Sequence, residues 1–300
     1  MPDAARRRAW LQMHACVLLW AFTAILGKLI TLPAPQLVAW RLLLVVAMLA
    51  LLPRAWRAVR AFPAALRWRY AGIGAVVALH WLAFYGSIKL ANASVATICL
   101  AIAPATIALL DPLLHGEPLR RGDLGLGLAV VPGIAMIGGG IPAGMGTGLL
   151  AGIVSALLAA TYMLLNKRWI GERDALGVSA LEFVAGLALV LALLPLLDGG
   201  EPTMPRLLGP LAWPAPRDFA LLLLLAGACT LLPFALSLVA LRQVSAFTMQ
   251  LSVNLEPIYA IAMATAFLGE ARELGAWFYA GAALVIGAVL WHGWRAARPG

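Results

Sequence analysis

Charged residues are scarce in this 300-residue sequence. Only 12% of the chain is Asp, Glu, Lys or Arg, whereas 63% is hydrophobic and the mean hydropathy is +0.93. A soluble domain has about 45–50% apolar and about 25% charged residues. The composition therefore excludes an ordinary soluble domain and indicates an integral membrane protein.

Cysteines and catalytic motifs are also few. Cys16, Cys99 and Cys229 fall in three different apolar segments without paired spacing, so they predict neither a disulfide framework nor a metal clip. The four histidines are far apart in sequence, and neither H-E-x-x-H nor G-x-S-x-G occurs. We expect no metal, no cofactor and no enzymatic activity, with an intramembrane enzyme as the remote alternative.

Long apolar runs make up most of the chain. They are separated by short charged or Pro/Gly-rich breaks, and about 20 apolar residues suffice to cross a bilayer as a helix. A membrane barrel would instead show alternation over about ten residues, which the sequence lacks. The sequence predicts an all-α membrane protein that forms a single membrane domain over residues 1–300. Ten transmembrane helices are expected, at 10–30, 36–52, 70–88, 92–114, 124–140, 148–166, 176–197, 219–239, 246–268 and 274–294.

The basic residues are distributed unevenly over the predicted loops. If the chain begins inside, one side receives sixteen of the 22 Lys and Arg, the other side receives five, and Arg41 lies within a helix. Cytoplasmic loops carry such an excess, so both termini are predicted to be cytoplasmic. The same bias explains the net charge of +9 without a nucleic-acid partner. The expected partners are the lipid bilayer and a small-molecule substrate.

The sequence repeats itself at an offset of 153 residues, without a gap over three predicted helices. Near the start of each half the offset is about 139. Two repeats of five helices follow, at residues 10–140 and 148–294. Because five is odd, the second repeat must enter the membrane from the opposite face, which gives the inverted repeats found in many secondary transporters. The pairs at an offset of 153 are Gly74 and Gly227, Ala93 and Ala246, Pro104 and Pro257, Gly116 and Gly269, Glu117 and Glu270, and Gly122 and Gly275.

Two segments, "PATIALLDPLLHGE" and "EPIYAIAMATAFLGE", close the fourth helix of each repeat in Gly-Glu. With ten helices in about 300 residues, the chain resembles the EamA type of the drug/metabolite transporter superfamily. The resemblance covers nearly the whole chain. It implies export of metabolites or amino acids through a central cavity between the repeats, as in an exporter group for aromatic amino acids.

Aromatic and polar residues at mid-membrane depth are the candidate ligands of a substrate. His80 could bind substrate, carry a proton, or be a neutral imidazole bonded to a backbone carbonyl. Glu256 could face the pathway or make a structural bond to a polar neighbour, because a carboxylate at that depth needs water or a partner. The predicted substrate-binding residues are Trp20, Thr23, His80, Trp81, Phe84, Tyr85, Tyr162, Asn166, Ser252 and Glu256.

Pro104 and Pro257 occupy the same place in the two repeats. A proline removes a backbone donor and kinks a helix, so the pair could act as hinges or shape the cavity. Prolines are also tolerated in membrane helices for packing alone. Glu117 and Glu270 are expected to be structural, each at the N-terminus of the helix that follows it. The intramembrane charges Asp111, Arg41 and Glu182 could couple transport to an ion or lock helices together.

The sequence favours a secondary transporter that exports small amphipathic metabolites across the cytoplasmic (inner) membrane by alternating access. Amino acids with large apolar or aromatic side chains are the expected substrates. A nucleotide-sugar or drug carrier of the same superfamily is the alternative. The sequence leaves open whether transport is coupled to protons or is facilitated diffusion, and whether the protein is a monomer or an oligomer.

Overall fold

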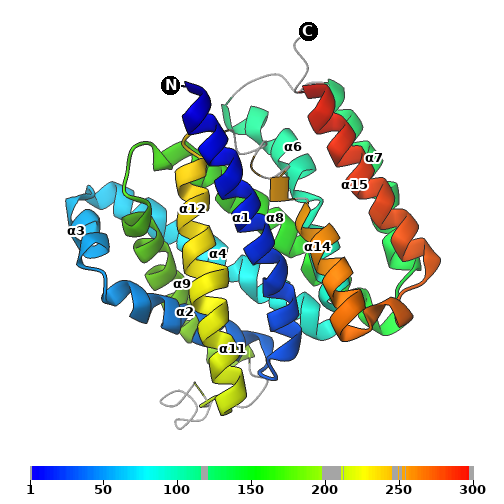
Figure 1. Ribbon diagram of the computed structural model, residues 1–300, viewed down its shortest axis with the longest axis horizontal. Coiled ribbons are helices and arrows are strands. Elements are labelled where there is room, and N and C mark those ends of the chain that lie inside the picture. The colour runs from blue at the N-terminus through cyan, green and yellow to red at the C-terminus, as the bar shows by residue number, and fades with distance from the viewer. Residues whose placement is uncertain are drawn as a thin grey trace.

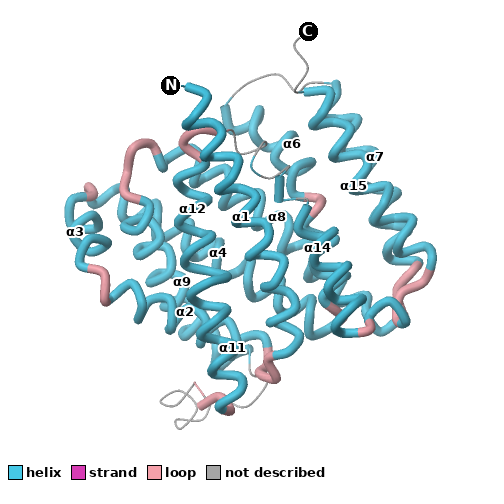
Figure 2. Tube along the Cα trace, viewed as in Figure 1, coloured by secondary structure: helices cyan, strands magenta, loops and turns pink. Residues whose placement is uncertain are grey.

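Helices make up nearly all of the structure, a computed structural model that describes residues 2–115, 121–197, 211, 213–244, 249, 252–253 and 255–296. These residues contain no β-strand, and short loops join the helices (Figure 2). The predicted all-helical class is confirmed. The first half of the chain contains α1 (Pro2–Leu29), α2 (Ala34–Ala50), α3 (Pro53–Ala61), α4 (Ala64–Leu90), α5 (Ala93–Leu100), α6 (Ala103–His115) and α7 (Arg121–Gly139). The second half contains η1 (Ala143–Met145), α8 (Gly146–Ile170), α9 (Ala175–Leu197), α11 (Pro216–Ala226), η2 (Gly227–Leu231), α12 (Leu232–Ala240), α14 (Leu255–Met263), η3 (Ala264–Leu268), η4 (Glu270–Arg272) and α15 (Ala276–Ala296).

Several helices are long and apolar enough to cross a bilayer. The described residues contain six such helices, or seven if α2 and α3, which are bent by 90° to each other, count as one span. Three shorter apolar helical segments, at Ala129–Gly139, Leu255–Leu268 and Ala276–Ala288, fall within the other predicted spans. The chain is thus a multi-pass membrane protein, and ten spans remain a prediction.

The packing of the helices is preserved when the two halves are exchanged. The opening helix α1 packs against α12 and α14, and the opening helix α8 of the second half packs against their counterparts α4 and α6. The pairs α2 with α9 and α7 with α15 join equivalent helices, and the second pair forms one edge of the molecule (Figure 1). This pattern is that of two similar halves around an approximate twofold axis. The start of α1 and the end of α15 lie at the same end of the molecule (Figure 1).

Two predicted helices are interrupted. The segment predicted at 92–114 is divided into α5 and α6, with Ala101 and Ile102 between them. Pro104 is the second residue of α6, where a missing backbone N–H leaves no helical bond unmade. The segment predicted at 219–239 contains a π-helical turn, η2, between α11 and α12. The short basic helix α3 was not predicted, because its three arginines interrupt the apolar pattern.

Small residues allow a close helix contact between the halves. A Cβ atom on Gly74 of α4 would overlap the backbone carbonyl oxygen of Glu182 on α9. On the facing helix, a Cβ on Gly186 would lie 3.0 Å from the carbonyl oxygen of Gly74. The backbones of α4 and α9 are therefore in direct contact, as in other membrane helix pairs with small residues at the crossing point.

The carboxylate of Glu270 caps a helix of the opposite half. It accepts hydrogen bonds from the backbone N–H groups of Ala93 and Ser94, both at 3.0 Å, and from the Ser94 hydroxyl at 2.8 Å. The structural role expected for Glu270 is therefore at the N-terminus of α5, whose dipole favours an anion, rather than at α15. Gly269, with φ of 71°, supplies the left-handed turn before it. Glu117, the predicted counterpart, lies outside the described residues.

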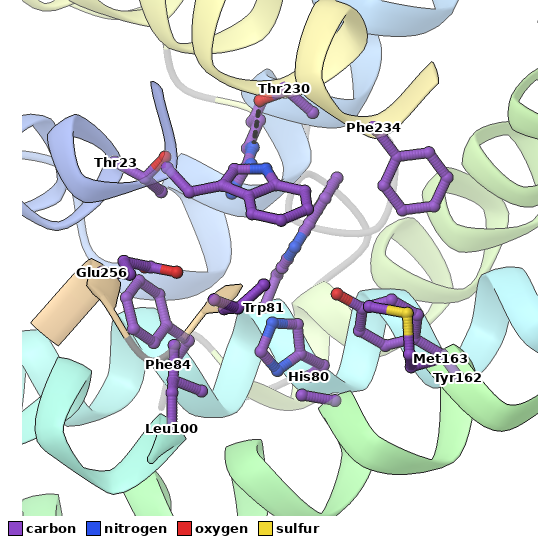
Figure 3. Close-up of a pocket in the computed structure, with 14 residues that line it drawn as sticks. Thr23, His80, Trp81, Phe84, Leu100, Tyr162, Met163, Thr230, Phe234 and Glu256 are labelled. Atoms are coloured by element: carbon purple, nitrogen blue, oxygen red, sulfur yellow. Dashed lines mark hydrogen bonds between the residues drawn. The ribbon is translucent and has the colours of Figure 1, made fainter. Parts of the chain in front are cut away.

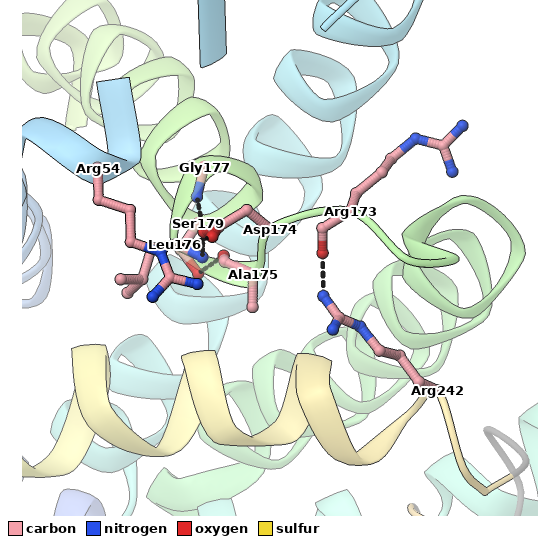
Figure 4. Close-up of polar contacts among 8 residues, drawn as sticks. All are labelled: Arg54, Arg173, Asp174, Ala175, Leu176, Gly177, Ser179 and Arg242. Carbon is pink, nitrogen blue, oxygen red and sulfur yellow. Dashed lines mark hydrogen bonds and ion pairs between the residues drawn. The ribbon is translucent and has the colours of Figure 1, made fainter. Parts of the chain in front are cut away.

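Basic side chains bind backbone carbonyl groups close to the ends of helices in both halves. Lys89, at the end of α4, donates to the carbonyl oxygen of Ile30 just after α1, at 2.5 Å. Its counterpart at the offset of 153, Arg242, donates to the carbonyl oxygen of Arg173 after α8 (Figure 4). The repeated base thus binds a backbone carbonyl group in both halves.

The N-terminus of α9 is held by Asp174. Its carboxylate accepts hydrogen bonds from the backbone N–H groups of Leu176 and Gly177, at 3.0 and 3.3 Å. It also forms an ion pair of 2.9 Å with Arg54 of α3 (Figure 4). This contact ties the short helix α3 to α9 at the surface of the molecule.

Candidate functional site

A cavity lies between helices of both halves. Its empty volume is about 610 Å³, part of which is continuous with the solvent. Figure 3 shows aromatic rings from α4, α8 and α12 around it, with the Glu256 carboxylate pointing inward from α14. The residues that line it are Trp20, Thr23, Arg41, His80, Trp81, Phe84, Leu100, Ala159, Tyr162, Met163, Thr230, Phe234, Val253 and Glu256.

Most of the residues predicted to bind substrate face this cavity. They are Trp20, Thr23, His80, Trp81, Phe84, Tyr162 and Glu256. The other three predicted residues do not line it. Tyr85 is buried behind the wall, Asn166 lies beside Glu182 of α9, and Ser252 is buried at the start of the α14 segment.

Four pairs of lining positions are related by the offsets of the sequence repeat. Near the start of each half the offset is 139, and later in each half it is 153. Equivalent positions of the two halves therefore face the same space, which places the cavity on the approximate twofold axis. The pairs are Trp20 and Ala159, Thr23 and Tyr162, Trp81 and Phe234, and Leu100 and Val253.

Arg41 was not among the predicted ligands, although it lines the cavity. Its Nε donates to the Thr230 hydroxyl at 2.6 Å, and its Nη1 donates to the Tyr85 hydroxyl at 2.8 Å. The guanidinium lies 3.7 Å from the centre of the Trp81 ring, a cation–π contact. These three neighbours, on two other elements, hold the charged plane in one orientation.

The π-helical turn η2 positions Thr230 for this contact. The Thr230 hydroxyl donates to the carbonyl oxygen of Leu225, five residues earlier, at 2.5 Å and accepts from Arg41. A π-turn inserts one extra residue into a helix and often marks a functional site. The sequence gives little sign of a π-turn, so Thr230 could not be found from the pattern of residues.

The aromatic wall continues behind the cavity. The Trp81 ring stacks on Phe183 of α9 with centroids 5.6 Å apart, and Phe183 lies 4.7 Å from Phe234. Tyr162 contacts Phe234 at 6.3 Å and His80 at 5.5 Å. Rings from four helices thus form a connected apolar surface, suited to an apolar or aromatic group.

His80 is fixed to α8. Its Nδ1 lies 2.9 Å from both the carbonyl oxygen and the hydroxyl of Ser155. The ring also stacks on Phe84, with centroids 6.1 Å apart. The contact with a backbone carbonyl was one of the alternatives for His80, and it coexists here with a place on the cavity wall.

Other intramembrane polar residues lie away from the cavity. The amide of Asn166 donates to the carboxylate of Glu182 at 3.5 Å, between α8 and α9. Neither residue lines the cavity. Pro104 follows the α5–α6 break, and Pro257 lies next to Glu256 in the first turn of α14. Both prolines are thus close in sequence to the lining without being part of it.

One family model matches this chain twice, over residues 8–139 and again over residues 146–292. The chain belongs to the EamA-like transporter family. The resemblance seen in the sequence is confirmed, and with it a membrane transporter of the drug/metabolite superfamily, built from two repeats. The family match is silent on which substrate an EamA-like protein carries.

The EamA-like fold is also found among solved structures. One of them is described only as the crystal structure of a protein. The match covers 94% of this chain and 94% of the other, with a TM-score of 0.63 and 19% sequence identity. At this identity the likeness concerns the fold alone. Among curated proteins no match was found.

Proposed function

We propose that this EamA-like protein is a secondary transporter that exports amino acids with large apolar or aromatic side chains across the cytoplasmic membrane. The observation that carries the proposal is the cavity, with its aromatic walls, the guanidinium group of Arg41 and the carboxyl group of Glu256. A site that is mostly apolar and has a few fixed polar groups is typical of small-molecule recognition. An amphipathic amino acid presents both kinds of surface.

The aromatic rings support a large side chain in the substrate. Trp81, Phe84, Tyr162 and Phe234 surround the space with flat apolar faces. Aromatic pairs gain about 0.5–1.5 kcal/mol beyond the area that they bury. A ring or a branched chain of the substrate would replace contacts with water by contacts with these faces. Small amino acids would leave that surface unfilled.

Alternating access follows from the proposed inverted repeats. If ten helices span the membrane, each half holds five, and the halves have opposite orientations. Exchange of the conformations of two similar halves would then open the cavity to one side and afterwards to the other. The place of the cavity on the approximate twofold axis supports this mechanism. The excess of basic residues on one side supports cytoplasmic termini.

A nucleotide-sugar carrier is less well supported by the lining. Phosphate groups are usually bound by several Lys or Arg side chains. Arg41 is the one Lys or Arg among the described residues of the cavity. A cationic drug would suit Glu256 and the rings, but it would leave the charge of Arg41 without a role.

A counterflow assay tests the proposal. Purified protein in liposomes loaded with unlabelled leucine or phenylalanine should take up the labelled amino acid, and alanine variants at Trp81, Tyr85 or His80 should lower the rate. Trp68→Ala is the matched control, because Trp68 lies on the same helix α4 but is 79% exposed. Exchange of nucleotide sugars without exchange of amino acids, with wild-type rates in all three variants, would contradict the proposal.

A further inference from the structure

No carboxylate among the described residues is in direct contact with the charge of Arg41. Arg41 is only 2% exposed, and its hydrogen-bond partners Thr230 and Tyr85 are both neutral. The ion pair seen among the described residues joins Arg54 and Asp174 at the surface. An arginine that locks helices would be expected to meet a carboxylate, because a buried charge without a partner is strongly destabilising.

The geometry of the guanidinium leaves one nitrogen for a ligand. Thr230 binds Nε and Tyr85 binds Nη1, while Trp81 covers one face of the plane. Within the described part of the chain, no hydrogen bond is seen for Nη2. The side chain is therefore held by neutral groups, in a fixed orientation, with a donor remaining beside the cavity.

Gly27 contributes to this arrangement. A Cβ atom at Gly27 of α1 would lie 2.5 Å from Cε1 of the Tyr85 ring. The absence of a side chain lets Tyr85 occupy the space between α1 and α4, from which its hydroxyl reaches Arg41. Tyr85 thus acts on the cavity through Arg41, although it does not line the cavity itself.

Glu256 provides the opposite charge. It lines the same cavity from α14 and is 4% exposed. Arg41 and Glu256 do not form an ion pair with each other. The lining therefore offers one guanidinium group and one carboxyl group.

We infer that Arg41 binds a single carboxylate of the substrate while Glu256 faces its ammonium group, so that the cavity selects zwitterions. The inference rests on the proposed transport of amino acids and assigns one residue to each charged end of the ligand. Arg41 completes its hydrogen bonding with the ligand carboxylate. A ligand with two or more negative charges meets one arginine and the repulsion of Glu256.

The test compares three ligands that share a phenyl ring: labelled L-phenylalanine, phenethylamine, which lacks the carboxylate, and 3-phenylpropionate, which lacks the ammonium group. Equilibrium binding of each is measured on the purified full-length protein, the Arg41→Gln variant and the Arg57→Gln variant. Arg57 is the matched control, because it is an exposed arginine of α3.

The wild-type protein should bind phenylalanine most tightly. Arg41→Gln should weaken the binding of phenylalanine and 3-phenylpropionate by about 10- to 100-fold, which is the effect of one charged hydrogen bond. The affinity for phenethylamine should not change. Arg57→Gln should match the wild type for all three ligands. Arg41→Lys, which keeps the charge but lacks the planar fork held by Thr230 and Tyr85, should weaken the same two ligands less. If Arg41→Gln does not yield folded protein, the binding measured with Arg41→Lys tests the inference.

Two results overturn the inference in different ways. If the Arg41 variants bind all three ligands equally more weakly, or bind them as the wild type does, Arg41 has a structural role and the proposed amino acid transport is not contradicted. A wild-type protein that binds none of the three ligands contradicts the proposed function and the inference together.

Discussion

The two halves of the chain present equivalent helices to the cavity, but with different polar side chains. Trp81 and Phe234 are both aromatic, whereas Glu256 corresponds to Ala103 and His80 corresponds to Pro233. By contrast, Lys89 and Arg242, which both donate to backbone carbonyl groups, are basic in both halves.

This difference has a physical reason. A side chain that binds a backbone carbonyl group can have the same task in both halves, as Lys89 and Arg242 do. An amino acid has one positive and one negative end and lacks twofold symmetry. In a site on the twofold axis, the residues that contact the two charged ends of an amino acid must therefore differ between the two halves.

The largest effect is expected from a substitution that restores the repeat. Glu256→Ala gives the second half the residue that the first half has at Ala103. We expect phenylalanine counterflow to fall by about 10- to 100-fold, because the charged contact to the ammonium group is lost. Glu172→Ala, at an exposed position between α8 and α9, should keep the wild-type rate. Wild-type counterflow in Glu256→Ala would remove Glu256 from the site.

Gly74 and Gly227 match in sequence but differ in their surroundings. A Cβ on Gly74 overlaps the backbone of α9, whereas a Cβ on Gly227 would have its nearest neighbour, Cε of Met48, at 3.6 Å. Gly74→Ala should therefore destabilise the protein by about 1–3 kcal/mol, the usual cost of overpacking. Gly227→Ala should cost less, and Gly72→Ala, with open space around its Cβ, should be nearly neutral. Thermal unfolding midpoints of the purified variants measure the order, and equal midpoints would contradict the close α4–α9 contact.

Glu270 and Glu273 are neighbouring acids with different tasks. Glu270 is buried and accepts three hydrogen bonds at the start of α5, whereas Glu273 is exposed and accepts one from Asn92. Glu270→Ala should cost about 1–3 kcal/mol, since buried donors lose their acceptor. Glu273→Ala should cost less. Hydrogen exchange at the Ala93 and Ser94 amides reports the cap directly, and unchanged protection in Glu270→Ala would count against it.

The smallest effects are expected at the paired prolines. Replacing Pro104 or Pro257 with alanine should slow exchange by several-fold while the amount of folded protein changes less, because each restores a backbone donor beside the cavity helices. Counterflow rates are compared with the yield of monodisperse protein. Normal exchange in both variants would assign the prolines to packing rather than to hinges.

Some of the site could be predicted because its signals are local in sequence. An aromatic or acidic residue near the middle of an apolar run is conspicuous, and this identified Trp81, Tyr162 and Glu256. The same hydropathy signal gave the all-helical fold. Arg41 was assigned to the membrane, but its neighbours Thr230 and Tyr85 come from other helices and could not be paired with it from the sequence.

Other features depend on three-dimensional packing. Leu100 and Val253 line the cavity, yet an apolar residue in an apolar helix carries no sign of which way it faces. The turn that aims Thr230 is a local change of helix type, and the partner of Glu270 lies 176 or 177 positions away in the chain. The repeat offsets help to find such residues, because once Leu100 is known to line the cavity, the offset of 153 indicates Val253.

The orientation of the two halves is the central claim, and residues 118 and 271 test it most directly. They follow the fourth predicted helix of each repeat, at 92–114 and 246–268. Reporter fusions after residue 118 should give a cytoplasmic signal, and fusions after residue 271 should give an outside signal. Matching signals at the two sites would contradict the inverted repeats and the alternating-access mechanism built on them.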